Sequence, residues 1–162
     1  MAGPFYGKFR GVVTDNNDAN HLGRIRAKVP DVFGNEDSGW AMPAVPYAGR
    51  QVGLYLIPPV DALVWIEFEH GDPEYPIWTG CFWGTERELP VSPVKVEKKV
   101  LKTGAGTITL DDTQGSTSIT IETTNNLKLK MDQQGIEISN GAQKIKISSS
   151  SVSIDDGALE VT

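Results

Sequence analysis

The sequence has a single cysteine, Cys81, among its 162 residues. One cysteine excludes a framework of disulfides within the chain and is compatible with a reducing compartment. No apolar run approaches the roughly 18 residues that a membrane-spanning helix needs. The first residues also lack the charged segment and apolar core of a secretory signal. We therefore expect synthesis in the cytoplasm without a signal peptide.

Aromatic residues and prolines are missing from the last part of the chain. All thirteen aromatic residues lie between Phe5 and Trp83, and all ten prolines lie at or before Pro93. Large rings normally fill the space between the sheets of a globular sandwich, whereas a narrow stack of short strands has room only for aliphatic side chains. Because proline is absent, every backbone N–H there can join a strand ladder. The break near residue 90 predicts two domains.

An excess of basic residues is also missing. The formal net charge is −6 at pH 7, with −5 in residues 1–90 and −1 in residues 91–162. Proteins that bind nucleic acid neutralise phosphates with lysine and arginine, and single-strand binders interleave those residues with aromatic ones. We therefore expect no nucleic-acid partner, and we expect Trp65, Trp78 and Trp83 to lie in the core or in a subunit contact. A nucleic-acid-binding barrel with an oligomerisation tail remains an alternative, which a gel shift at low salt would reveal.

Residues 106–162 contain seven short runs in which aliphatic and polar residues alternate. This period of two is typical of strands with one buried face, and the runs recur every seven to eleven residues. The aliphatic positions predicted to face inward are Ile108, Leu110, Ile119, Ile121, Leu127, Leu129, Met131, Ile136, Ile138, Ile145, Ile147, Val152, Ile154, Leu159 and Val161. Burial of these side chains in one copy is too small to offset the conformational entropy lost by nearly sixty ordered residues. The pattern favours a tail that buries its aliphatic side chains against other copies of itself.

The first half of the chain contains five strand candidates and no stretch of helical period longer than a turn or two. The candidates are residues 5–14, 22–30, 52–57, 63–68 and 77–84. Five short strands in about 85 residues, separated by turn sequences, predict a small five-stranded barrel. Residues 85–105, with Pro90 and Pro93, read as an extended connector.

Several motifs resemble the spike proteins of contractile injection systems. They are G-x-V-x-x-N-x-D from Gly11 to Asp18, L-G-R-I-R-A-K-V-P at 22–30, W-A at 40–41, P-x-V-D-A-L-V-W-I-E-F at 58–68 and G-D-P-E-Y-P-I-W-T-G at 71–80. The resemblance covers phage baseplate spikes, the valine-glycine repeat spikes of type VI secretion and the spikes of phage-tail-like injection particles. It implies an all-β chain with an oligonucleotide/oligosaccharide-binding (OB-fold) barrel at 1–84, a connector at 85–105 and an intertwined trimeric β-helical needle at 106–162.

The resemblance also implies a function. It predicts a non-enzymatic homotrimer without cofactor or metal, attached through its barrels to a baseplate hub protein, with its needle pointing at a target membrane that it contacts transiently. The particle is virion-like, cytoplasmic, membrane-anchored or extracellular, and it carries an effector in some systems. The resembling spikes are capped by a separate tip protein of the PAAR type, rich in proline, alanine and arginine. We expect Leu159, Val161 and Thr162 to bind such a tip.

The chain departs from the resembling families in three places. Asp61 stands where a glycine is usual, which predicts a locally reshaped turn. No lysozyme domain fits between barrel and needle, and the two histidines, His21 and His70, lie in the barrel rather than in a metal-binding tip motif. We therefore transfer neither wall-cutting activity nor a tip metal to this chain.

Three local features have ordinary structural explanations. Gly71, Asp72 and Pro73 predict a tight turn in which the Asp72 carboxylate accepts backbone N–H groups. Glu67 and Glu69 have the strand spacing of a carboxylate pair, which leaves a glycan-binding or glycan-cleaving protein with a β-helical stalk as an alternative. We predict that Cys81 is a small buried hydrophobic residue and that no residue is catalytic.

Overall fold

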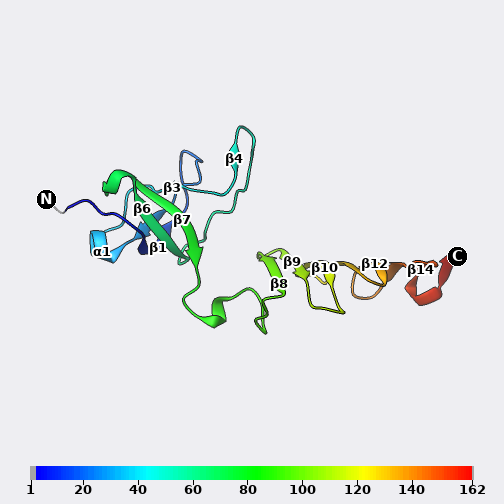
Figure 1. The fold of residues 1–162 in the computed structure, drawn as a ribbon. Coiled ribbons are helices and arrows are strands. Elements are labelled where there is room, and N and C mark those ends of the chain that lie inside the picture. Colours follow the sequence, from blue (N-terminus) through cyan, green and yellow to red (C-terminus); the bar gives the residue numbers. More distant parts are fainter. Residues whose placement is uncertain (1–2, 162) are drawn as a thin grey trace. The chain divides into compact units, whose positions relative to one another are not determined.

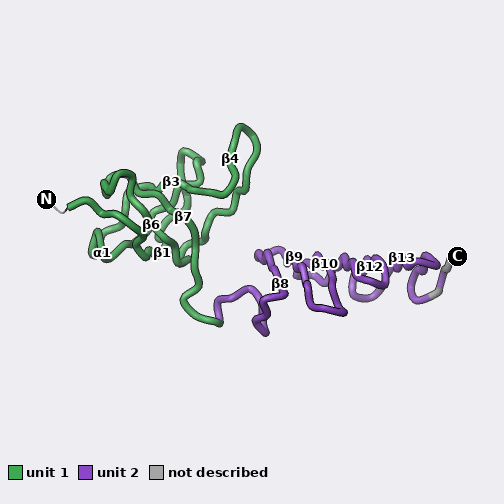
Figure 2. Tube along the Cα trace, viewed as in Figure 1, with its two compact units in different colours: residues 1–86 green, residues 87–162 purple. Residues whose placement is uncertain are grey.

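The computed structural model describes residues 3–161 of the chain. They form two compact units, one within residues 1–86 and one within residues 87–162 (Figure 2). Strands dominate both units, and the helical elements are single turns: α1 (Pro30–Phe33), η1 (Glu69–Gly71), η2 (Glu86–Glu88) and η3 (Asp155–Gly157). The prediction of an all-β chain is confirmed. Across residues 3–161, no helix has the length and apolar character required to cross a membrane.

The first unit is built on a curled five-stranded sheet (Figure 1). Its strands are β1 (Phe9–Asp15), β2 (Arg26–Lys28), β3 (Met42–Pro43), β6 (Leu63–Phe68) and β7 (Pro76–Phe82), in the order β2-β1-β6-β7-β3. Neighbouring strands are antiparallel except β3 and β7, which are parallel. An antiparallel bridge between Ile25 and Ala41 connects the residue before β2 to the residue before β3 and draws the two ends of the sheet together. This curled sheet agrees with the predicted OB-fold barrel.

The barrel core follows from the alternation along these strands. Every second residue of β6 is buried, as the period of two requires. The buried hydrophobic residues are Val13, Ile25, Ala27, Val29, Ala41, Val64, Ile66, Phe68 and Trp78. The ring of Phe68 lies within 5.5–6.1 Å of the rings of Phe5, Phe9 and Phe33, measured between centroids. Trp78 is therefore in the core, as predicted, and its indole N–H donates to the carbonyl of Gly23 at 3.1 Å.

The prediction of a barrel strand at residues 52–57 is wrong. Only Val52 and Gly53 form a strand, β5 (Val52–Gly53), and it pairs with β4 (Ala48–Gly49) in a separate hairpin that projects from the barrel (Figure 1). The fifth strand of the barrel is β3 instead. The apolar run misled the prediction because most of it is exposed, and only Ile57 packs against the core.

The second unit is one antiparallel sheet of eight strands. They are β8 (Lys98–Lys102), β9 (Gly106–Asp111), β10 (Ser118–Thr123), β11 (Lys128–Asp132), β12 (Gly135–Ser139), β13 (Lys144–Ile147), β14 (Val152–Ile154) and β15 (Leu159–Val161). Each strand pairs with the strands that precede and follow it in the chain. The seven runs recognised in the sequence match β9 to β15. The sheet begins earlier, with β8, inside the segment predicted as a connector.

Candidate functional site

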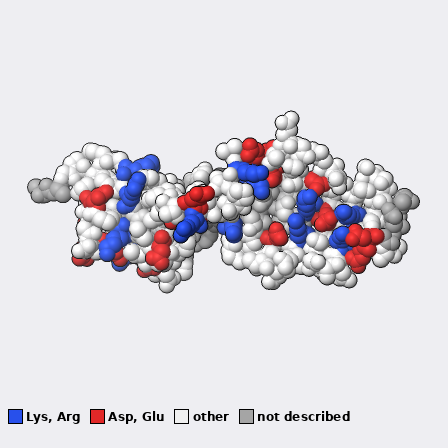
Figure 3. All heavy atoms as spheres, turned by 90° about the horizontal axis from the view of Figure 1, so that it is seen from below, with Lys and Arg blue, Asp and Glu red and all other residues white. Residues whose placement is uncertain are grey.

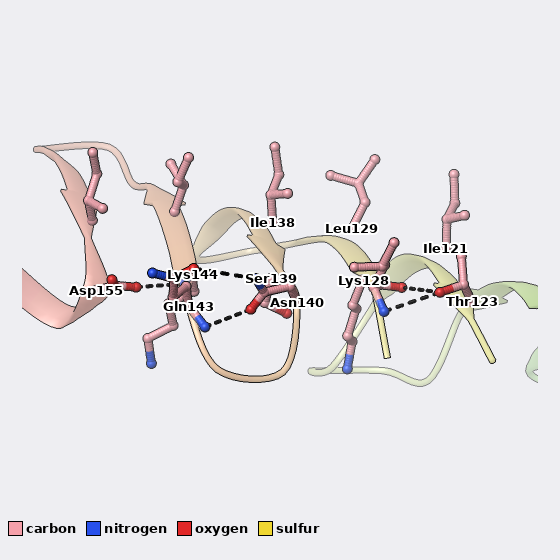
Figure 4. Close-up of a pocket in the computed structure, with 13 residues that line it drawn as sticks. Ile121, Thr123, Lys128, Leu129, Ile138, Ser139, Asn140, Gln143, Lys144 and Asp155 are labelled. Carbon is pink, nitrogen blue, oxygen red and sulfur yellow. Dashed lines mark hydrogen bonds between the residues drawn. The ribbon is translucent and has the colours of Figure 1, made fainter. Parts of the chain in front are cut away.

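One face of the eight-stranded sheet carries two continuous rows of aliphatic side chains. Each row consists of residues directly opposite one another on successive strands. Ladder A is Leu101, Ile108, Ile121, Leu129, Ile138, Ile145, Ile154 and Leu159, and ladder B is Leu110, Ile119, Met131, Ile136, Ile147, Val152 and Val161. Every strand from β9 to β15 contributes one residue to each ladder. Figure 4 shows Ile121, Leu129 and Ile138 of ladder A pointing the same way.

The two ladders are largely uncovered in the single chain. Ile154 is 36% exposed, Ile138 is 50% exposed, and Leu129 and Met131 are half-buried. Cross-strand aliphatic pairs stabilise a sheet, but a contiguous apolar face of this size on a soluble protein marks an interaction surface. The face is therefore the main candidate functional site of the second unit.

The structure places the predicted inward residues as follows. Twelve of the thirteen proposed core residues between Ile108 and Ile154 belong to the two ladders. Leu127 is the exception, because it precedes β11 and is not part of the strand pairing that defines the ladders. Leu159 and Val161 are the last ladder residues, whereas Thr162 lies outside the described residues. Leu101 was not among the predicted residues, because residues 85–105 were predicted to be a connector without strands.

A hollow of about 600 Å³ lies beside ladder A. Its apolar lining comes from five members of that ladder, from Ile121 to Ile154, together with Leu127. Its polar rim comes from Thr123 at the end of β10, from Asn140 and Gln143 in the turn that joins β12 to β13, and from Asp155 after β14 (Figure 4). The hollow therefore runs along one edge of the apolar face.

The opposite face of the sheet is polar, and its acidic and basic side chains lie opposite one another. Lys130 lies opposite Glu137, which in turn lies opposite Lys146 at 3.8 Å between charged atoms. A hydrogen bond from Lys130 lowers the pKa of Asp132, and that bond raises the pKa of Lys130. Acidic and basic side chains are interspersed on the surface seen in Figure 3. Such a face suits contact with water, and its exposed ion pairs contribute little stability.

In the barrel, a buried carboxylate organises the loop that follows β1. Asp18 is 5% exposed, and its two oxygens accept hydrogen bonds from Arg24, at 2.6 Å from Nη2 and 3.1 Å from Nε. The same oxygens accept the backbone N–H groups of Asn20 at 3.0 Å and Leu22 at 2.8 Å. The hydrogen bond from Arg24, helped by these amides, holds the pKa of Asp18 well below its usual range. Arg24 in turn lies 5.6 Å from the ring of Trp40. Asp18 closes the first sequence motif, but the motif alone indicates no role for it.

The turn at Gly71 fastens the start of the chain to the barrel. The carbonyl of Gly71 accepts the N–H of Phe5 at 2.8 Å. Gly71 has φ +78°, and a Cβ there would come within 2.9 Å of the Pro4 side chain, so only glycine fits. The Asp72 carboxylate accepts the N–H of Glu74 at 3.0 Å, as expected of an Asx turn. The segment therefore has a structural explanation without any ligand.

Asp61 keeps the backbone that a glycine would adopt. Its φ is +70°, in the left-handed region. Its N–H donates to the carbonyl of Val13 at 2.9 Å, and the N–H of Val13 donates to the carbonyl of Ala62 at 2.9 Å. The loop thus meets β1 with regular hydrogen bonds.

The remaining candidates do not gather into a reactive site. Glu67 lies on β6 and forms an ion pair with Lys8, whereas Glu69 lies beyond the strand in η1, so the two carboxylates do not share a strand face. Cys81 is exposed, which corrects the prediction of a buried thiol. Trp83 is also exposed. Within residues 3–161, no three histidine, cysteine, aspartate or glutamate side chains are grouped so that they could hold a metal ion.

Comparison with known proteins agrees with the two units. Residues 9–83 match the family model described as the type VI secretion system/phage-baseplate injector OB domain, and residues 98–160 match the phage baseplate V C-terminal trimerisation domain. The type VI secretion system spike protein VgrG5 of Pseudomonas aeruginosa is 29% identical over 112 residues, which are 62% of this chain and 14% of that protein. The chain therefore spans a small part of that relative's length. It belongs to the family of spike proteins of phage baseplates and type VI secretion systems.

Proposed function

We propose that three copies of this chain form the central, non-enzymatic spike of a contractile injection particle, with ladders A and B as the trimer core. One observation carries the proposal: the two ladders stay exposed on one chain, in the segment that matches a trimerisation domain. Each aliphatic side chain is about half covered already, so its complete burial adds about 1 kcal/mol. Summed over three copies of two ladders, this gain makes assembly strongly favourable.

The pairing within the sheet supports one form for this trimer. Successive strands from β8 to β15 make their hydrogen bonds within one chain. Three such sheets would therefore pack as the sides of a prism, with the ladders inside and the charged faces in water. Short turns and paired strands leave no long loop that could yield under load. Such a prism suits a mechanical role, in which sheath contraction drives the spike through a target membrane.

The hairpin of the first unit is the proposed contact with a baseplate hub protein. Tyr47, Leu54, Tyr55 and Leu56 are exposed on it and on the segment that follows, and Tyr55 is 74% exposed. Arg50 is the single charged residue between positions 42 and 60. An apolar, nearly uncharged surface on an injector OB domain has the composition of a permanent protein contact.

The end of the sheet is the proposed contact with a tip protein. β15 pairs with β14 on one side, and no strand within residues 3–161 pairs with its other side. Open strand edges in natural proteins are normally covered. A separate PAAR-type tip that binds Leu159, Val161 and Thr162 would cover this edge in all three copies.

Co-expression with hub and tip candidates encoded beside this chain tests both contacts in one experiment. The double variant Leu54→Ser with Tyr55→Ser should abolish capture of the hub and leave capture of the tip unchanged. Deletion of residues 157–162 should do the reverse, so each variant serves as the control for the other. The proposal fails if neither change affects capture, or if both abolish the same interaction.

A further inference from the structure

The two ladders occupy different surroundings on the same sheet. Along each strand, the ladder A residue and the ladder B residue are two positions apart, as Ile138 and Ile136 are on β12. The turns that join β10 to β11 and β12 to β13 lie beside ladder A and line the hollow of about 600 Å³. The turns that join β11 to β12 and β13 to β14 lie beside ladder B. The apolar face therefore has two distinct edges.

Three-fold symmetry requires unlike surfaces to meet. In a ring of three copies, each interface joins one patch of a chain to a different patch of the next chain, because an isologous contact would close after two. The only two edges that the apolar face offers are those of ladders A and B. We infer that ladder A and its hollow in one copy receive ladder B of the neighbouring copy. This inference rests on the proposed trimer.

The geometry also assigns which residues meet. The strands follow one another along the sheet, so the two ladder residues of one strand share one level. Rotation about an axis along the stack keeps every residue at its level, so Ile138 of one copy meets Ile136 of the next. Each level then holds six aliphatic side chains in alternating A and B order, and like residues of different copies are separated by an unlike one.

This arrangement explains the polar break at the start of ladder B. Lys99 is opposite Leu110 on the apolar face of β8, where the other strands carry an aliphatic residue. Its ammonium group donates a hydrogen bond to the carboxylate of Asp112 on the turn after β9. Lys99 and Asp112 lie on the ladder B side, so the apolar contact between copies should begin at the level of β9.

Cysteine cross-linking between distinguishable chains tests the inference. One chain carries Ile138→Cys and a first tag, the other carries Ile136→Cys and a second tag, and Cys81→Ser removes the native thiol from both. Sedimentation first measures the oligomeric state of the mixture, and a short bis-thiol reagent then links the cysteines. We expect the linked product to contain one chain of each kind. Products that join two Ile138→Cys chains, or two Ile136→Cys chains, should be minor.

A control variant and a second pair of cysteines complete the cross-linking test. Glu137→Cys lies between the two positions but on the opposite face, so chains that carry it should not cross-link. If the first pair weakens assembly, Ile145→Cys and Ile147→Cys on β13 repeat the test one level further along. Like-with-like products in equal or greater yield, or no product from an intact trimer, would overturn the ladder pairing alone. Absence of a trimer in sedimentation would instead overturn the proposed function.

Discussion

The carboxylate of Asp18 and the guanidinium of Arg24 form a two-point ion pair, with nitrogen–oxygen distances of 2.6 and 3.1 Å, next to the barrel core. The side chain of Asp18 is almost completely buried, and that of Arg24 is 19% exposed. Removal of one partner from such a pair leaves the other charge poorly solvated, which costs more than the intact pair contributes. Asp18 is therefore expected to be one of the most sensitive positions of the barrel.

Asp18→Asn should destabilise the barrel by about 2–3 kcal/mol, because the amide cannot replace both charged hydrogen bonds. Denaturant unfolding followed by tryptophan fluorescence measures this, since all four tryptophans lie in residues 1–86. Asp15→Asn is the matched control. The Asp15 carboxylate accepts one backbone N–H, from Asn17, and its loss should cost less than about 1 kcal/mol. Equal losses in the two variants would contradict the role given to Asp18.

The stability of the barrel should fall in acid because of the same residue. The pKa of Asp18 is lower in the folded chain than its ordinary value of 3.8, so the unfolded chain binds the proton more readily. The stabilisation is complete above about pH 5 and decreases as the pH falls through the unfolded-state pKa toward the lower folded-state pKa. Tryptophan-monitored unfolding between pH 5 and pH 2 should show a steeper loss for the natural chain than for Asp18→Asn. Parallel curves would show that other carboxylates cause the acid sensitivity.

Asp61 should tolerate glycine but not valine. Glycine adopts the φ of +70° without a steric cost, so Asp61→Gly should change the free energy of unfolding by less than about 1 kcal/mol. A β-branched side chain is strongly disfavoured in this region, and Asp61→Val should cost about 1–2 kcal/mol. Thermal unfolding of the two variants makes the comparison. A valine variant as stable as the glycine variant would mean that the loop can abandon this conformation.

Charge on the apolar face should prevent assembly. Ile145→Asp places three carboxylates in the proposed trimer core, at a cost of several kcal/mol each before relaxation. Ile136→Asp should act in the same way. Ser153→Asp is the control, because Ser153 lies on the opposite face of the sheet, directly across from Lys146. Sedimentation should show loss of the trimer for Ile145→Asp and no change for Ser153→Asp. An intact trimer of unchanged stability in the Ile145→Asp variant would exclude that residue from the core.

The alternation of side chains made the second unit readable from the sequence. The seven strands from β9 to β15 could be predicted because a period of two shows directly on which face of the sheet each residue lies. The same signal failed at residues 52–57, where apolar side chains project from the hairpin instead of entering the core. The alternation also did not predict β3. This strand has only two residues, which is too short for a period of two to be recognised.

The alternation of apolar and polar residues does not predict which side chains meet across a loop or between strands. Asp18 and Arg24 lie six positions apart in the segment between β1 and β2, and no periodic pattern links them, so the contact between their charges could not be predicted. Cys81 lies near the end of β7, where the strand leaves the barrel, and hydrophobic neighbours alone suggested burial. The exposure of both ladders, in contrast, follows from the same alternation that predicted them.

The mass of the purified chain in solution tests the central claim most directly. Sedimentation equilibrium of residues 1–162 at micromolar concentration should give three times the 17.6 kDa of one chain, because in the proposed trimer the other two copies cover both ladders. The trimer should persist on dilution, since a face of this extent gives a slow rate of dissociation. A folded species of 17.6 kDa, with the apolar face open to water, would contradict the account.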